Sequence, residues 1–227
     1  MNGANRPSPD FQRNPTPVKL RIVSLLILSL LSACSRKGLV QDGGVYITRS
    51  ACPQVGIPAA TGDVTLFNPP QSRDAAAIDV TASITNLFNN CNETGDRVLS
   101  NAGFDVVAVR RDAGPARQVV LPFFSVAVQG GSEMVAKRVG QVVLNFPAGS
   151  QRAQARGQAV IWVNRAAATL PANVREILTR RRKAGEAEAA IDPLSDPAVR
   201  AAVARATFEH LVGFQMTPDM LKYNATR

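Results

Sequence analysis

The sequence predicts an α+β protein, in which an antiparallel β-sandwich is followed by C-terminal α-helices. Three observations lead to this fold class. Apolar residues recur at every second position through most of residues 45–163, which is typical of half-buried strands. Segments rich in Gly, Pro and Asn separate these runs at short intervals, as in all-β sandwiches and barrels. After Val163 the apolar spacing becomes helical, so a block of strands precedes a block of helices.

The first element along the chain, residues 1–33, has the three-part pattern of a secretory signal peptide. Lys19 and Arg21 precede an apolar run at residues 22–31, and small residues follow it. A membrane-spanning helix needs roughly 20 apolar residues, so this run fits the core of a signal peptide better. The stretch before Lys19 is rich in Pro and Asn, and translation from near Val18 is an alternative start.

The four residues Leu31-Ser32-Ala33-Cys34 resemble the lipobox of bacterial lipoproteins. The resemblance implies that the Cys34 thiol receives a diacylglycerol, that the chain is cleaved just before it, and that the new amino terminus is acylated. Stable anchoring takes at least two such signals, which a triacylated Cys34 provides without a protein helix. The alternatives are an ordinary signal peptide with an incidental cysteine, or a short membrane anchor.

Residues 34–44 are then a short tether that holds the following domain close to a membrane. Ser35 follows the cysteine, whereas an aspartate at that position resembles the inner-membrane retention mark of enteric bacteria. We therefore expect the periplasmic face of the outer membrane, with the periplasmic face of the inner membrane as the alternative.

The two remaining cysteines, Cys52 and Cys91, predict a disulfide, because an even pair in an oxidising compartment is most simply a bridge. Two free buried thiols are the alternative. The two cysteines and the distant His210 lack the ligand spacing of a metal site, and we expect neither a metal nor a cofactor.

About seven short strands are expected in residues 45–163, including segments 44–49 and 63–68. We expect an immunoglobulin-like or fibronectin-III-like sandwich, because the pattern resembles extracellular modules of that kind. The apolar run 118–131 predicts a central strand, although Pro122 demands a bulge or an edge position. The expected inward-facing residues are Ile78, Val80, Ala82, Ile84 and Phe88; Phe104, Val106 and Ala108; Val142, Leu144 and Phe146; and Ala153, Ala155, Ala159, Ile161 and Val163.

Residues 164–227 predict a helical segment packed on the sandwich. A first helix begins near Pro171 and carries Val174, Ile177 and Leu178 at helical spacing. A second begins with Asp196 as N-cap and Pro197 at the first helical position, and is expected to run on to residue 214.

The whole chain carries a net charge of +9, and removal of residues 1–33 leaves 22 basic and 16 acidic residues, or +6. A secreted protein rarely meets nucleic acid, so the expected counterparts are anionic lipids, lipopolysaccharide phosphates or an acidic protein. Arg180, Arg181, Arg182 and Lys183 form the densest basic run and are a possible anion-binding site. The alternative is a solvated helix end whose cations pair with Glu186 and Glu188.

Catalysis is not expected, because the sequence has no nucleophile elbow, no paired-His helix and no phosphate-binding Gly loop. His210 is the single histidine of the chain, in a segment expected to be helical. The sequence therefore favours a non-enzymatic envelope lipoprotein that acts as an adaptor or accessory subunit of a membrane-associated assembly. The alternative is a module that binds anionic lipid or lipopolysaccharide through residues 180–183.

Overall fold

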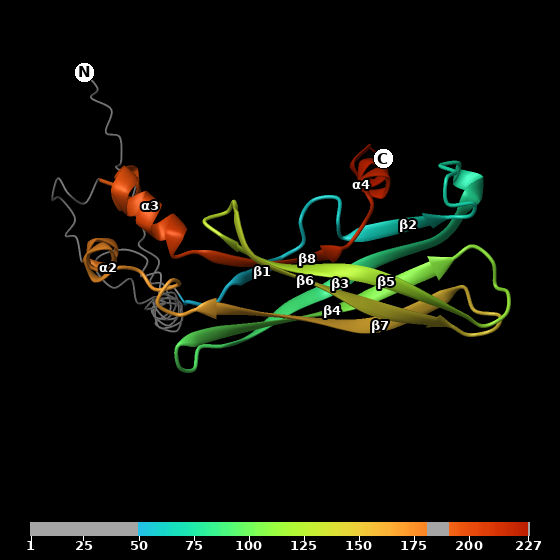
Figure 1. The fold of residues 1–227 in the computed structure, drawn as a ribbon, viewed down its shortest axis with the longest axis horizontal. Helices are drawn as coiled ribbons and strands as arrows, with labels where there is room; N and C mark the ends of the chain where they lie inside the picture. The colour runs from blue at the N-terminus through green and yellow to red at the C-terminus, as the bar shows by residue number, and fades with distance from the viewer. Residues whose placement is uncertain (1–49, 181–190, 227) are drawn as a thin grey trace, which may run out of the picture. The chain divides into compact units, whose positions relative to one another are not determined.

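Two four-stranded β-sheets make up most of the described protein (Figure 1). The computed structural model describes residues 50–180 and 191–226, all within the unit Val45–Arg227. One sheet has the strand order β1-β8-β5-β6 and the other the order β2-β3-β4-β7. Neighbouring strands are antiparallel except β1 and β8, which are parallel. The predicted combination of antiparallel sheets and helices is therefore confirmed at this level.

Strands β3 to β7 are long, each with 13 to 15 residues, so the expectation of short strands was wrong for them. The expected strand at 44–49 lies outside the described residues. The strands are β1 (Gln54–Gly56), β2 (Asp63–Phe67), β3 (Ile78–Asn92), β4 (Arg97–Arg110), β5 (Arg117–Gln129), β6 (Glu133–Phe146), β7 (Arg152–Asn164) and β8 (Phe208–Phe214), and the helices are α2 (Ala172–Thr179), α3 (Pro197–Arg205) and α4 (Pro218–Thr226).

The main core lies between the two sheets, because alternate residues of each strand point inward. Phe104 of β4 and Phe123 of β5 meet edge to face across it, with ring centroids 5.1 Å apart. The inward-facing sets predicted for β4 and β6 are buried, and that of β7 is buried from Ala159 onward. The two sheets thus share this main apolar core.

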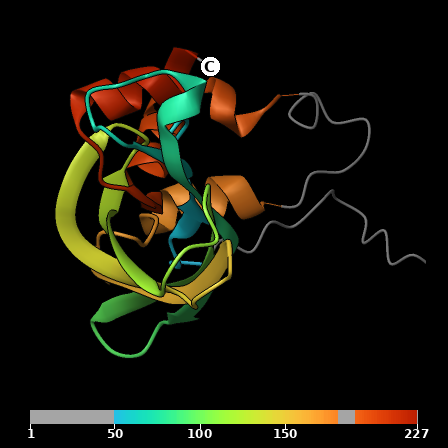
Figure 2. The same cartoon turned by 90° about the vertical axis from the view of Figure 1, so that its right-hand side faces the viewer.

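Strands β5 to β8 follow the spatial order β8-β5-β6-β7. β6 and β7 lie side by side where the two sheets meet, as the view along the strands also shows (Figure 2). The chain then returns through a long connection, which contains α2 and α3, to place β8 beside β5. Three consecutive strands with the fourth beside the first form a Greek key, which is common in two-sheet proteins.

Phe88 departs from the predicted inward set of β3. The pairing of β3 with β4 shifts register between Thr85 and Phe88, and Asn86 in this segment has a positive φ of 51°. The shift moves Phe88 to the outer face of the sheet, where it is 54% exposed. A strict period-two pattern could not show this irregularity.

Pro122 lies inside β5, which has neighbours on both sides, so the predicted bulge or edge position was wrong. Its carbonyl accepts a hydrogen bond from the Gln215 N–H, just beyond the end of β8 at Phe214. Proline therefore sits beside the point where the paired part of β8 has ended, so the N–H that proline lacks falls outside the β5–β8 ladder. The register shift of β5 lies instead between Ala127 and Val128.

Residues 208–214 correct the prediction of a continuous C-terminal helix. Asp196 does cap α3, since its carboxylate accepts a hydrogen bond from Ala198 N–H at 2.7 Å, but α3 ends at Arg205. β8 follows, because Phe208, Val212 and Phe214 fall at alternate positions with His210 and are buried on one face of a strand. The segment expected to be one helix is therefore a helix followed by a strand.

Four glycines within strands each face a phenylalanine ring on the neighbouring strand. A Cβ atom built on Gly157 would lie 2.2 Å from Cζ of Phe104, and the other three sites are similarly tight. Each ring therefore occupies the space that a side chain would otherwise fill. The pairs are Phe88–Gly103, Phe104–Gly157, Phe123–Gly140 and Phe124–Gly213.

The helices lie at two separate places on the sheets. α2 and α3 lie together at one end of the strands and share a small apolar cluster centred on Val174, Val199 and Ala202 (Figure 1). α4 packs on β2, where Tyr223 meets Phe67 edge to face at 5.1 Å. No helix in the described ranges is long and apolar enough to cross a membrane.

Candidate functional site

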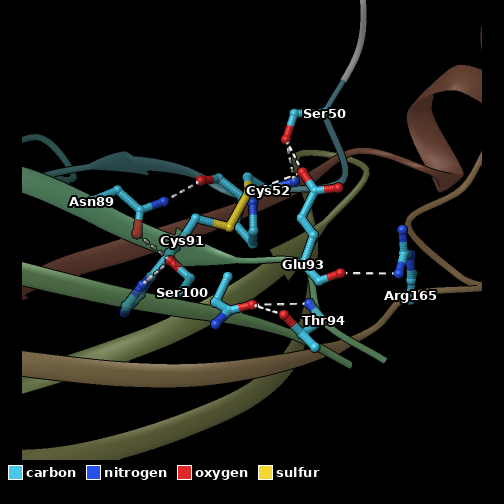
Figure 3. The surroundings of a disulfide bond; sticks show 11 residues. Ser50, Cys52, Asn89, Cys91, Glu93, Thr94, Ser100 and Arg165 are labelled. Atoms are coloured by element: carbon cyan, nitrogen blue, oxygen red, sulfur yellow. Dashed lines mark hydrogen bonds between the residues drawn. A yellow bond between two sulfur atoms is a disulfide. The ribbon is translucent and has the colours of Figure 1, made fainter. Parts of the chain in front are cut away.

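The predicted disulfide between Cys52 and Cys91 is present, with a Cα–Cα distance of 6.0 Å (Figure 3). It joins the segment before β1 to the end of β3. Asn89 strengthens the same junction, because its side-chain N–H donates to the carbonyl of Pro53 at 2.8 Å. The bridge therefore fixes the point at which the described chain enters the sheets, close to Ser50.

His210 lies in the core on the inner face of β8, with no exposed surface. Its ring nitrogens are each 2.9 Å from a serine hydroxyl, Nδ1 from Ser100 on β4 and Nε2 from Ser125 on β5. Ser100 donates its own proton to Asn89 Oδ1, so it accepts from Nδ1–H, and Ser125 donates to Nε2. The histidine is thus neutral and fully hydrogen-bonded.

Burial lowers the pKa of His210 from 6.5 to about 4. A histidine that bridges serines contains the residue types of a nucleophile and a base. Here, however, the side chains of all three residues are buried and a substrate cannot reach them. This arrangement ties the two sheets together, and the helical position expected for His210 was wrong because the residue belongs to β8.

An exposed apolar surface lies on the outer face of the β1-β8-β5-β6 sheet. Val120 on β5 lies directly opposite Val143 on β6, and both are at least 40% exposed. Val139, also opposite a β5 residue, is 58% exposed. We call this the β5–β6 outer surface; its residues are Val120, Phe124, Met134, Val139 and Val143.

β6 borders this surface as the last strand of its sheet. Within the described ranges no strand pairs with its outer edge, so backbone donors and acceptors are open to another chain along the part of β6 that β7 does not lie beside. Lys137 lies in the middle of β6, and its ammonium sits over the Phe124 ring at 5.8 Å from the centroid. Arg138 follows it. The edge is therefore apolar at several positions and positively charged at its middle.

The outer face of the β2-β3-β4-β7 sheet is different. β7 presents Arg152, Gln154, Arg156 and Gln158 outward in alternation. Arg156 forms an ion pair with Asp105 on β4 at 3.5 Å. Apolar residues do occur there, including Trp162 and Val109, but they alternate with these polar rows. Of the two faces, the β5–β6 outer surface is the better candidate for protein contact.

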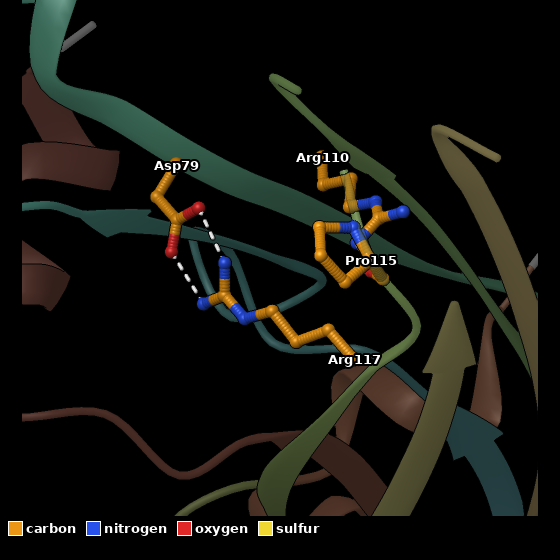
Figure 4. Close-up of polar contacts among 4 residues, drawn as sticks. All are labelled: Asp79, Arg110, Pro115 and Arg117. Atoms are coloured by element: carbon orange, nitrogen blue, oxygen red, sulfur yellow. Dashed lines mark hydrogen bonds and ion pairs between the residues drawn. The ribbon is translucent and has the colours of Figure 1, made fainter. Parts of the chain in front are cut away.

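At the end of the strands opposite α2 and α3, polar contacts hold the β4–β5 and β6–β7 loops in place (Figure 4). Arg110 is 3% exposed, and its guanidinium donates four hydrogen bonds to backbone carbonyls of these loops. Arg117 makes a two-pronged bond to Asp79, at 2.7 and 2.5 Å. The hydrogen bonds from Arg117 hold the pKa of the Asp79 carboxyl below its usual value.

Of the other candidate site residues predicted from the sequence, only Arg180 lies within the described residues. Arg180 follows α2, with its side chain 58% exposed and 3.7 Å from Glu176. Arg181, Arg182 and Lys183 lie outside the described residues, as does Cys34. The ranges 50–180 and 191–226 contain no cluster of three or more His, Cys, Asp or Glu side chains placed to hold a metal.

Sequence reasoning missed the β5–β6 outer surface and the cluster around Arg117. The signal for the first was present, because residues 139–144 carry valines on both faces of the strand. No local pattern signals the second, since Asp79 and Arg117 are distant in sequence and come from different sheets.

No known protein family model, curated protein sequence or solved structure matches this chain.

Proposed function

We propose that this protein is a lipid-anchored lipoprotein of the bacterial cell envelope that serves, without catalysis, as an adaptor or accessory subunit of an envelope assembly. The observation that carries the proposal is the β5–β6 outer surface beside the unpaired edge of β6. Soluble proteins usually protect such an edge or cover it with another chain. We infer that a partner protein covers this one.

The partner's chemistry follows from the charges on β6. A strand added along this edge places its side chains near Lys137 and Arg138, so carboxylates on the partner are favoured at those positions. Apolar residues on the same strand then pack against Val139 and Val143, which are exposed on the outer face. The expected partner is an envelope protein that presents an extended segment of mixed acidic and apolar residues.

Site-specific crosslinking in cells tests this assignment. A photoreactive amino acid at position 139 should yield one discrete adduct, whereas the same group at position 109 should not. Val109 is the matched control, since it is 47% exposed on an outward strand position of the other sheet. Val139→Glu should abolish the adduct formed from a second photoreactive group at position 143. Equal adducts from positions 139 and 109, or none from either, would contradict the proposal.

The anchor and the address are supported by the lipobox-like residues that end at Cys34 and by the disulfide, which suits an oxidising compartment. We propose the periplasmic face of the outer membrane, with the inner membrane as the alternative. Globomycin blocks cleavage of lipobox signal peptides, so it should cause the precursor to accumulate. Cys34→Ala should release the protein from membranes, and retention of that variant would remove the anchor.

The finer fold proposal is an immunoglobulin-like or fibronectin-III-like sandwich. Two stacked sheets and a Greek key support this class. The strand order differs from that of immunoglobulin constant domains, because β3 and β4 pair as a hairpin within one sheet and β7 lies beside β4. We therefore propose a sandwich of that architecture with a strand order of its own.

A second candidate function is binding of anionic lipid or lipopolysaccharide through residues 180–183. The exposed Arg180 favours it, because its guanidinium is 3.7 Å from the Glu176 carboxylate, beyond hydrogen-bond distance, and 58% of the side chain is open to a phosphate. Binding to vesicles that contain phosphatidylglycerol should weaken as salt rises. Neutral residues at all four positions should abolish it, and unchanged binding would eliminate this function.

A further inference from the structure

An open cleft of about 490 Å³ lies where β2, the first residues of β3 and β5, and α4 come together. This volume is in the range of small-molecule sites in proteins, roughly 300 to 1,000 Å³. The residues that matter for its chemistry are Leu66, Phe67, Arg73, Asp79, Arg117 and Met220. None of the residues that line the cleft belongs to the β5–β6 outer surface or to the 180–183 run, so neither binding function explains the cleft.

The charges around the cleft are unequal. Arg73 and Arg117 line it, and Asp79 is the single carboxylate among the lining residues. Arg110 lies near Asp79 (Figure 4), and its guanidinium is bonded to backbone carbonyls rather than to a carboxylate. Two guanidinium groups and one carboxylate therefore line the cleft. Asp74, which follows Arg73, is exposed and bonds to the hydroxyl of Ser72. The cleft thus has an excess of positive charge.

Arg73 is held in place on the cleft wall. Its Nη1 donates to the carbonyls of Pro70 and Ser72, at 2.8 and 2.6 Å. Its guanidinium lies over the ring of Phe67, 5.1 Å from the centroid, and Phe67 is itself held by Tyr223. Nε and Nη2 make no hydrogen bond to any described residue. A side chain fixed in this way loses little freedom when it binds an anion.

Another part of the cleft wall is apolar, and this restricts the chemical class of ligand that the cleft can bind. Leu66, Phe67 and Met220 contribute apolar surface next to the guanidinium groups. A bare inorganic anion would use only the charged side, whereas a molecule that joins an oxyanion to an apolar group would use both.

We propose that this cleft binds a small organic oxyanion, in which a carboxylate or phosphate is attached to an apolar group. The oxyanion accepts hydrogen bonds from Arg73 and faces Arg117, and the apolar group packs against Phe67 and Met220. Guanidinium groups suit both carboxylate and phosphate, because their parallel N–H donors match two oxygens of either. The proposal goes beyond the adaptor function and is independent of it.

Ligand-observed NMR on the full chain in detergent can test the cleft with four probes: benzoate, phenyl phosphate, inorganic phosphate and benzylamine. Benzoate or phenyl phosphate should bind, and the tighter of the two identifies the oxyanion. Benzylamine has the same ring with a positive charge and should not bind. Arg73→Gln should raise the dissociation constant about tenfold, equivalent to one charge-assisted hydrogen bond. Arg152→Gln, an exposed arginine on β7, should leave it unchanged.

A second variant examines the apolar half of the cleft. Met220→Ala should weaken phenyl phosphate and leave any affinity for inorganic phosphate unaltered, with circular dichroism to verify the fold. The inference is overturned if neither organic anion binds, if benzylamine binds equally well, or if Arg73→Gln has no effect. None of these results bears on the crosslinks expected at position 139, so the two proposals fail separately.

Discussion

Acid should destabilise this protein through His210 before it does so through the Asp79 carboxylate. The folded state lowers the pKa of His210 from 6.5 to about 4 because the ring is buried between Ser100 and Ser125. Between these two pH values the unfolded chain binds the proton and the folded chain does not. Stability is therefore complete above pH 6.5 and falls as pH drops toward 4.

The magnitude follows from the two pKa values. At pH 5 the lost free energy of unfolding is about 2 kcal/mol, and below pH 4 it reaches about 3 kcal/mol. Protonation of Asp79, which is held by Arg117, also lowers the free energy of unfolding. The pKa of Asp79 in the folded protein, however, lies below its ordinary value of 3.8. The window from pH 6.5 to pH 4 thus isolates His210 from the Asp79–Arg117 pair.

Two measurements test this expectation. Because the chain has one histidine, its Cε1 proton gives a single NMR signal, whose titration midpoint should lie near pH 4. Urea unfolding at pH 7.5 and pH 5 should show the loss in the wild type, and His210→Gln should remove that part of the pH dependence. A midpoint near 6.5, or an equal slope in the variant, would refute the reasoning.

Three further predictions concern stability and use urea or thermal unfolding. Reduction of the Cys52–Cys91 bond should lower the free energy of unfolding by about 4 kcal/mol, because 39 residues separate the cysteines; a change below 1 kcal/mol would contradict the chain-entropy argument. Gly157→Ala should cost about 1–3 kcal/mol through overlap with the opposing ring, whereas Gly114→Ala, with open space around it, should be nearly neutral. Asp196→Ala should cost about 1 kcal/mol through loss of the α3 cap, an effect that Asp196→Asn should largely avoid.

Local patterns predicted the fold as far as periodicity alone can. Alternation located the strands from β2 to β7, and the Asp196-Pro197 pair located the start of α3. Periodicity failed where the register shifts, as at Phe88, and where a helix gives way to a strand within a few residues, as before Phe208. A pattern averaged over a window cannot show such a break.

The candidate sites depend on contacts that no local pattern contains. The disulfide could be predicted because two cysteines allow one pairing. The β6 edge required the strand order, since neither free edges nor neighbours can be read from one strand. The cleft required Arg73, in the loop after β2, and Arg117 of β5 to line one space beside α4. Such sites depend on the strand order, and the strand order follows from the packing of the whole core rather than from any local sequence pattern.

The phenylalanine–glycine pairs have a consequence for how the long strands find their partners. Strands with alternating valines can slide by two residues and still bury an apolar face, so many alignments have similar energies. If one strand slid by two residues, each phenylalanine ring would face a side chain and each glycine would be left uncovered. This holds in both sheets, for β3, β4 and β7 as well as for β5, β6 and β8. The pairs therefore act as alignment marks, and a glycine and its ring should change together or not at all as the sequence evolves.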